Sequence, residues 1–225
     1  MRKASVPTVS TVLALGLLLT ACGSGEDEAK PPAPKCDGTL STAAVGAVAS
    51  LLGTDAYGES GIGLGRTTDA LIADQAREGR PPGHPATCEI TTDASPKSGL
   101  GVDVWLHDSD SLYDDGTATW WKQGRYLYAM GREASADEKG AHLFVQCTSP
   151  RLKGSDKEPA PVGASIGFDK PIKGAYPANT AATREAYLTV LHSVTLGIVK
   201  KLECENNAGL PEQPVFETKK WRGQP

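Results

Sequence analysis

Apolar residues recur at two different spacings along this chain, and the spacings predict which segments are helices and which are strands. Residues 42–52 carry the helical spacing, with Ser41 before them as a cap and Gly53 after them as a stop. Residues 180–202 carry it over a longer stretch and predict a helix about 35 Å long. A shorter helix is expected at residues 69–78.

Between the first and last helices, apolar and polar residues alternate, as they do in half-buried strands. Strands are expected at residues 87–91, 100–107, 125–130, 142–148 and 162–168. The last of these is expected at the edge of the sheet. Because no long helix separates the strands, they are expected to be antiparallel. The sequence therefore predicts an α+β domain, in which an N-terminal and a long C-terminal helix pack on one face of an antiparallel sheet.

The N-terminus has the features of an export signal. Arg2 and Lys3 precede an apolar run at residues 12–19, which is shorter than the roughly 20 residues that a membrane span needs. The run ends in Leu-Thr-Ala-Cys at residues 19–22, which resembles the lipobox of bacterial lipoproteins. The resemblance implies transfer of a diacylglyceryl group to the sulfur of Cys22, followed by cleavage before Cys22. The alternative is an ordinary signal peptide in which Cys22 has no role.

Composition divides the chain into four segments. Residues 1–21 are the expected lipoprotein signal peptide, and the polar, Pro-rich residues 22–35 are the expected disordered tether. Residues 36–204 are the expected folded domain. Residues 205–225 are Pro-rich again and are expected to form a C-terminal tail.

The charge of the chain argues against nucleic acid as a partner. Its formal net charge is −4, which becomes −6 when residues 1–21 are removed, because they carry two basic and no acidic residues. A mildly acidic domain without a basic stripe is not expected to bind nucleic acid. It also has no electrostatic attraction to an anionic bilayer. The lipid on Cys22 would therefore hold the protein on the extracytoplasmic face of the cell membrane.

The cysteines that remain after Cys22 predict two disulfides, because an even number outside the cytoplasm is typical of a disulfide framework. They are Cys36, Cys88, Cys147 and Cys204. The sequence leaves three pairings open. We favour Cys36–Cys88 and Cys147–Cys204, because each would tie one terminal helix to the sheet. A zinc site is not expected, since no two cysteines have the short spacing of zinc ligands, and no other metal or cofactor is predicted.

Several short motifs together resemble small secreted lipoproteins of actinobacteria whose function is unknown. They are the lipobox, the Pro-rich tether, Cys-Asp at 36–37 before a helix that ends Leu-Leu-Gly at 51–53, and Thr-Cys-Glu at 87–89 before an alternating strand. The resemblance implies a membrane-anchored, disulfide-bonded α+β domain. It implies no catalytic residues.

One strand places three side chains of interest on the same face. Asp103, Trp105 and His107 occupy alternate positions of the strand at residues 100–107, so they would form a small polar site with an aromatic wall. The alternative is that this is the solvent-facing or helix-facing side of a half-buried strand.

The densest aromatic group lies further along the chain. Trp120, Trp121 and Tyr126 would suit contact with a ligand or a partner, and the alternative is packing within the domain. The acidic loop at residues 107–116 departs from the calcium-loop pattern. The glycines at residues 61–65 depart from the dinucleotide-binding pattern, and this stretch is expected to be a flexible loop.

These observations favour a non-catalytic lipoprotein that binds a protein or a small ligand of the cell envelope. The chain has no recognisable catalytic motif, although distant residues can still form a catalytic site. The alternative is an envelope hydrolase or carbohydrate-active enzyme that uses two carboxylates in a cleft. A third hypothesis is a purely structural component of the envelope, which predicts neither a cleft nor an exposed patch.

Overall fold

The structure is a computed structural model that describes residues 36–77, 86–92, 99–107, 123–170, 176–222 and 224. These residues belong to one compact unit, Pro32–Pro225. The predictions made for the signal peptide, Cys22, the tether, Trp120 and Trp121 lie outside the described residues.

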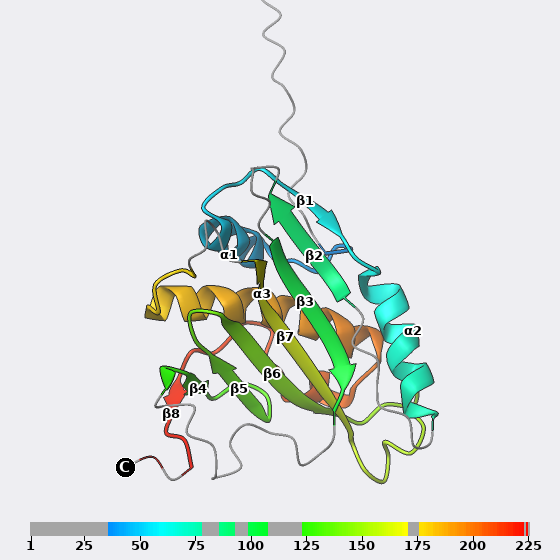
Figure 1. Cartoon of the computed structure of the whole chain (residues 1–225). Coiled ribbons are helices and arrows are strands. Elements are labelled where there is room, and N and C mark those ends of the chain that lie inside the picture. The colour runs from blue at the N-terminus through cyan, green and yellow to red at the C-terminus, as the bar shows by residue number, and fades with distance from the viewer. Residues whose placement is uncertain are drawn as a thin grey trace, which may run out of the picture. The chain divides into compact units, whose positions relative to one another are not determined.

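The described residues contain an eight-stranded sheet in which every neighbouring pair is antiparallel, as the sequence predicts (Figure 1). The order across the sheet is β1-β2-β3-β7-β6-β5-β4-β8. The strands are β1 (Tyr57–Ser60), β2 (Ala86–Thr92), β3 (Gly99–Leu106), β4 (Tyr126–Tyr128), β5 (Glu133–Ala136), β6 (Gly140–Cys147), β7 (Ala160–Lys170) and β8 (Thr218–Lys219).

Strand β7 lies in the middle of the sheet, so its predicted place at the edge is wrong. It pairs with β3 on one side and with β6 on the other. Its inward residues, such as Val162 and Ile166, are buried in the core. Its outward residues are small, among them Gly163, Ser165 and Gly167. Glycine weakens the sequence signal of a strand, and the short strands β1 and β5 were not predicted at all.

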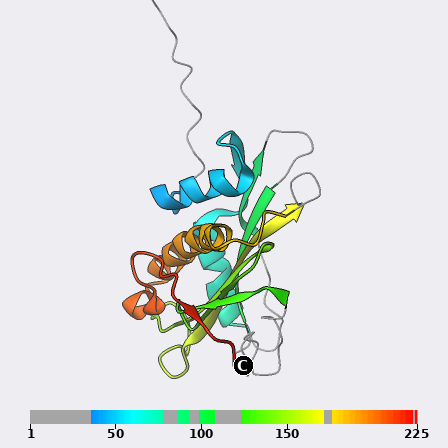
Figure 2. The same cartoon turned by 90° about the vertical axis from the view of Figure 1, so that its left-hand side faces the viewer.

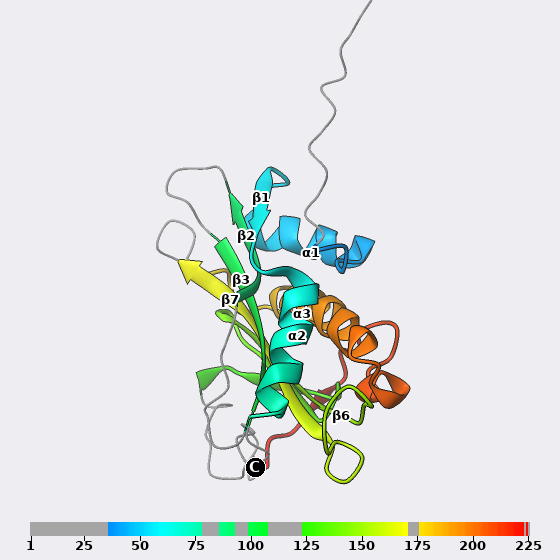
Figure 3. The ribbon, with the colours of Figure 1, turned by 90° about the vertical axis from the view of Figure 1, so that its right-hand side faces the viewer.

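Three α-helices of the described chain lie on one side of the sheet (Figures 2 and 3). They are α1 (Thr42–Leu52), α2 (Gly63–Gln75) and α3 (Ala181–Lys201). The predicted caps of α1 are confirmed, since the Ser41 hydroxyl accepts a hydrogen bond from the Ala44 amide and Gly53 takes a left-handed conformation. At α3, the Thr180 hydroxyl accepts from the Thr183 amide.

Helix α2 begins six residues earlier than the sequence predicts, at Gly63 rather than at residue 69. The expectation of a flexible loop at residues 61–65 is therefore wrong, because most of that stretch is the first turn of α2. Leu64 is buried in the core, and its burial outweighs the low helix propensity of the glycines beside it.

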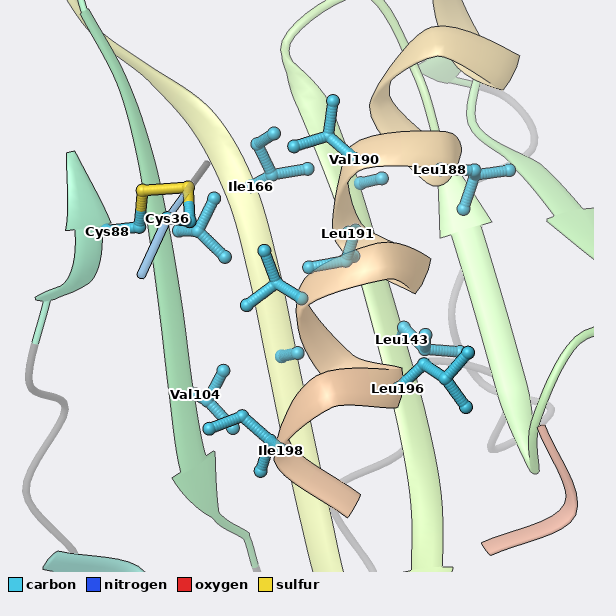
Figure 4. Packing of buried hydrophobic residues seen from close by; sticks show 14 of the residues in the cluster. Cys36, Cys88, Val104, Leu143, Ile166, Leu188, Val190, Leu191, Leu196 and Ile198 are labelled. Atoms are coloured by element: carbon cyan, nitrogen blue, oxygen red, sulfur yellow. A yellow bond between two sulfur atoms is a disulfide. The ribbon is translucent and has the colours of Figure 1, made fainter. Parts of the chain in front are cut away.

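Helix α3 covers the middle of the sheet and supplies much of the hydrophobic core (Figure 4). On α3, Val190 lies beside Ile166 of β7 and Ile198 lies beside Val104 of β3, and all four side chains are almost fully buried. The described part of the chain has no helix that is long and apolar enough to cross a membrane.

Two disulfides join distant parts of the chain, with the pairing that we favoured. Cys36 is bonded to Cys88, so the start of α1 is tied to β2 (Figure 4). Cys147 is bonded to Cys204, so the end of β6 is tied to the segment after α3. Each terminal helix is thus fixed to the sheet by a covalent bond.

The segment predicted as a C-terminal tail is packed on the domain where it is described. Strand β8 pairs with β4 and forms an edge of the sheet. Leu210 and Trp221 are buried, and the Trp221 indole donates a hydrogen bond of 3.0 Å to the Arg125 carbonyl. Phe216 packs against the core, whereas Val215 is exposed. The fold therefore continues beyond Cys204.

Candidate functional site

Four polar residues form a row across four neighbouring strands, on the face of the sheet that is turned away from the helices. The register pairs Asp103 of β3 with Ser165 of β7, Ser165 with His142 of β6, and His142 with Ser135 of β5. Directly paired residues of antiparallel strands carry their side chains on the same face, with Cβ atoms about 4.5–5.5 Å apart. We call these four residues the polar row.

Beside the polar row lies a row of three glycines. Gly101 of β3 pairs with Gly167 of β7, and Gly167 pairs with Gly140 of β6. Each glycine is two positions from a member of the polar row and therefore belongs to the same face. A Cβ atom on Gly140 would overlap the carbonyl oxygen of Ile166 and lie 3.1 Å from the Cα of Gly167. We call these three residues the glycine row.

The glycine row and three residues of the polar row, Asp103, Ser165 and His142, line a shallow groove of about 260 Å³. The glycine row forms the floor, and other atoms lie close over it: a Cβ atom on Gly167 would be 3.2 Å from the carbonyl oxygen of Lys139. Asp103 and Asp169 line the groove on the side of β3 and β7, and Lys139 and Arg125 line it on the side of β6 and β4. The carboxylate of Asp169 lies directly over Gly101, because a Cβ atom there would be 3.2 Å from its Oδ1. The groove therefore has an acidic side and a basic side.

An ion pair holds the basic side in place. The Arg125 guanidinium donates from Nε and Nη2 to Oδ2 of Asp137, at 2.9 and 2.7 Å. The other oxygen of Asp137 accepts hydrogen bonds from the amides of Lys139 and Gly140. Both partners are largely buried, so this pair fixes the β5–β6 turn that carries Lys139.

His142 is neutral at physiological pH. Burial is the main cause, and the nearby Arg125 guanidinium is the second, and together they lower the pKa of His142 to about 4 against an opposing effect of the Asp137 carboxylate. A neutral imidazole has one nitrogen that donates a hydrogen bond and one that accepts. His142 can therefore recognise a polar ligand without adding a charge to the groove.

Aromatic rings continue the same face beyond the polar row. The Trp105 ring lies over Gly163, where a Cβ atom would be 2.9 Å from its Cε2. Phe144 meets Trp105 edge-on at 6.4 Å between ring centroids, and it meets His107 at 4.9 Å. The structure thus places Asp103, Trp105 and His107 on one face, as the sequence predicts. Only Asp103 of the three lines the groove.

Tyr126 belongs to a different surface from the other predicted site residues. It pairs with Ala136, which is buried in the core on the helix side of the sheet. The Arg184 guanidinium of α3 lies 3.7 Å from the centroid of the Tyr126 ring. Arg184 also donates to the Tyr128 hydroxyl. These contacts hold the start of α3 against β4, and Tyr126 does not contribute to the groove.

Sequence reasoning found Asp103 but missed the other residues of the groove. Ser165, His142 and the glycine row are far apart in the chain, and only the strand register brings them together. One signal was present: a glycine stands two positions from a polar residue in all three central strands, as Gly101 and Asp103, Gly140 and His142, and Ser165 and Gly167. That pattern predicts a row of glycines beside a row of polar residues, once the strands are known to be neighbours.

A second groove, of about 410 Å³, lies where the start of α1 meets α3 and the segment after it. Its polar groups are engaged in holding these elements together. The Ser193 hydroxyl donates to the Thr39 carbonyl at 2.6 Å and accepts from the Ser41 amide at 2.9 Å, and Lys200 pairs with Glu212 at 2.7 Å. These hydrogen bonds and this ion pair join α1, α3 and the following segment, so we assign a structural role to the polar residues of this groove.

The cysteine sulfurs of the first disulfide lie near a carboxylate. Cys36, Cys88 and Glu59 have possible metal-ligand atoms within 4.8 Å of one another. The two sulfurs are bonded to each other, and a disulfide does not offer the thiolate that binds zinc. The structure therefore gives no metal site here.

The order of the polar row bears on catalysis. In a serine–histidine–aspartate triad the histidine lies between the other two residues, because it must contact both. Here Ser165 lies between Asp103 and His142, which are two strand spacings apart, or about 10 Å. The row therefore suits recognition of a polar ligand better than acyl transfer.

Comparisons with protein-family models, curated proteins and solved structures found no match to the chain.

Proposed function

We propose that this chain is a lipid-anchored protein of the extracytoplasmic face of the cell membrane, and that its domain binds a small polar ligand of the envelope in the groove. The groove is the observation that carries the binding part of the proposal. Its lining carries charges of both signs beside a row of three glycines, and neither feature is needed to build an antiparallel sheet. The lipobox at residues 19–22 supports the anchor, and two disulfides are typical of proteins outside the cytoplasm.

Binding without catalysis is favoured by the order of the polar row, in which Ser165, and not His142, is the residue between the other two. One observation favours a hydrolase as the second candidate: Asp103 and Asp169 both line the groove, and glycoside hydrolysis uses two carboxylates in one cleft. The two functions differ in a simple assay. A hydrolase would consume a bound envelope oligosaccharide, and the consumption would stop in Asp103→Asn, whereas a binding protein would release the ligand unchanged.

The anchor is tested with Cys22→Ser expressed in a bacterial host that processes lipoproteins. The wild-type chain is expected in the membrane fraction, with a mass increase that corresponds to the acyl chains. Cys22→Ser is expected to be unprocessed or shed, and Ser24→Ala, two residues away, is expected to behave as wild type. If Cys22→Ser is processed normally and stays with the membrane, the proposed anchor is wrong.

The groove is tested by a thermal-shift screen of envelope sugars, peptidoglycan fragments, peptides and lipids. A ligand at about 100 times its Kd stabilises the folded state by about 2.7 kcal/mol. Gly101→Val would fill the floor, and its first added atom meets only the flexible Asp169 carboxylate. The matched control is Gly58→Val in β1, where an added Cβ atom meets nothing within 4 Å. We expect Gly101→Val to abolish the shift and Gly58→Val to retain it; a shift that survives in both would place binding elsewhere.

A further inference from the structure

The charges of the groove are separated, and this separation restricts the class of ligand. Asp103 and Asp169 lie on the side of β3 and β7, with Gly101 between them. Lys139 lies at the opposite side, on the turn before β6, together with Arg125. Because Arg125 is already paired with Asp137, the positive charge offered to a ligand comes mainly from Lys139. A ligand with a single charge of either sign would meet repulsion on one side.

The strand register gives the length of the ligand. Strands β3 and β6 are separated by β7, so Asp103 of β3 and the start of β6, which follows Lys139, are two strand spacings apart, or about 10 Å. Asp169, on β7, is one strand nearer to β6. An extended peptide spans at most about 3.3–3.6 Å per residue. A peptide of about three residues therefore reaches from one side to the other, with its terminal ammonium at one end and its terminal carboxylate at the other.

The surface between the two sides also fits a peptide backbone. The groove has a volume of about 260 Å³, and the hydroxyl of Ser165 and the neutral imidazole of His142, which both line it, can each bond a peptide group. The described lining residues present no aromatic ring for a sugar to stack on, since Phe168 points into the core and meets Tyr187 there. Trp105 lies beyond the groove, over Gly163.

We propose that the groove binds short zwitterionic peptides, with the free ammonium held between Asp103 and Asp169 and the free carboxylate held by Lys139. This inference rests on the proposed function, which it deepens by naming the ligand class. The backbone groups of the three central strands are used by the sheet itself, so side chains provide the recognition. Length and the two free termini, rather than the side chains of the peptide, are what the groove selects.

The test compares tri-alanine with its capped forms by calorimetry on the oxidised full chain. We expect tri-alanine to bind, and N-acetyl-tri-alanine and tri-alanine amide each to bind at least tenfold more weakly. Asp103→Asn is expected to weaken tri-alanine about tenfold and to leave the N-acetylated peptide unaffected. Lys139→Gln is expected to weaken tri-alanine and to leave the amide unaffected. This pairing of variant and cap distinguishes a direct contact from a general loss of structure.

The matched controls are Glu158→Gln and Lys157→Gln. They make the same changes of charge in the exposed loop that follows β6, at the far end of that strand from Gly140, and they are expected to bind tri-alanine as the wild type does. Equal affinity of tri-alanine and the doubly capped peptide would overturn the inference. If a sugar or lipid headgroup binds in the groove and no peptide does, the ligand class is wrong and the proposed function stands; if nothing binds there, both are wrong.

Discussion

Gly140→Ala is the substitution on which the structure makes its sharpest prediction. The new methyl group would overlap the Ile166 carbonyl oxygen and lie 3.1 Å from the Gly167 Cα, and both of these atoms belong to the backbone of a central strand. A flexible side chain could move aside, but a strand that is paired on both sides cannot. The start of β6 must therefore shift away from β7.

The cost follows from three contributions. Overpacking of this kind costs about 1–3 kcal/mol. The shift also strains the hydrogen bond from the Asp137 amide to the Gly140 carbonyl, which is worth about 1 kcal/mol. Against these, replacing glycine restricts the unfolded chain and returns about 0.4–1 kcal/mol. We expect a net loss of about 2 kcal/mol, which lowers Tm by roughly 4–8 °C in a domain of this size.

Urea unfolding measures this loss as a lower midpoint at an unchanged slope. The control is the same substitution at Gly46, in the middle of α1, where an added Cβ atom meets nothing within 4 Å. Gly46→Ala is expected to stabilise the protein by about 0.5–1 kcal/mol, because alanine favours the helix. If Gly140→Ala is as stable as the wild type, the close approach of β6 and β7 is wrong.

Three further predictions concern stability. Replacing Cys147 and Cys204 together by alanine opens a connection with a sequence separation of 57 and is expected to cost roughly 4 kcal/mol; a calorimetric loss below about 1 kcal/mol would contradict it. The pKa of His142 is about 4 in the folded protein and about 6.5 in the unfolded chain, so between these pH values only the unfolded chain binds the proton. The free energy of unfolding should therefore fall as pH falls through this window. His142→Gln should remove part of that fall, and Arg125→Met should raise the pKa of His142 in an NMR titration; an unchanged pKa would exclude Arg125 as a cause. Ser41→Ala removes the cap of α1 and should cost about 1 kcal/mol in urea unfolding, whereas no loss would mean that solvent replaces the cap.

Local features of the sequence were enough to predict some elements. Helix α3 is evident because helical spacing, a Thr180 cap and a long uninterrupted stretch agree with one another. Strand β3 is evident because Leu100, Val102 and Val104 alternate with less apolar residues. In β3 burial alternates as the sequence does, whereas α3 is buried on nearly all sides from Val190 to Val199 and so hides more of its surface than its spacing predicts.

Other elements depend on contacts that a single segment does not contain. Strand β7 has Gly163 and Gly167 on its outer face and looks weak by itself, yet pairing on both sides makes it central. Helix α2 begins at Gly63 because Leu64 is buried by the rest of the fold. Trp221 docks onto β4 although a Pro-rich sequence precedes it.

The candidate site was predictable only in part, for a related reason. Asp103 could be found on its own strand, but its neighbours in the groove are set by register. A shift of β7 by one residue would turn Ser165 and Gly167 toward the core. Tyr126 was named as a possible ligand or partner contact because of the aromatic residues near it in the sequence, and the structure places its ring against Arg184, on the other side of the sheet from the groove.

The most direct test of the central claim is amide NMR of the full chain with each class of envelope ligand in turn. We expect a binding ligand to shift the amide signals of Gly101, Gly140 and Gly167 and to leave that of Ser193, in the second groove, in place. Shifts around Ser193 with the three glycine signals unmoved would contradict it, and so would a complete absence of shifts at the glycines with every class.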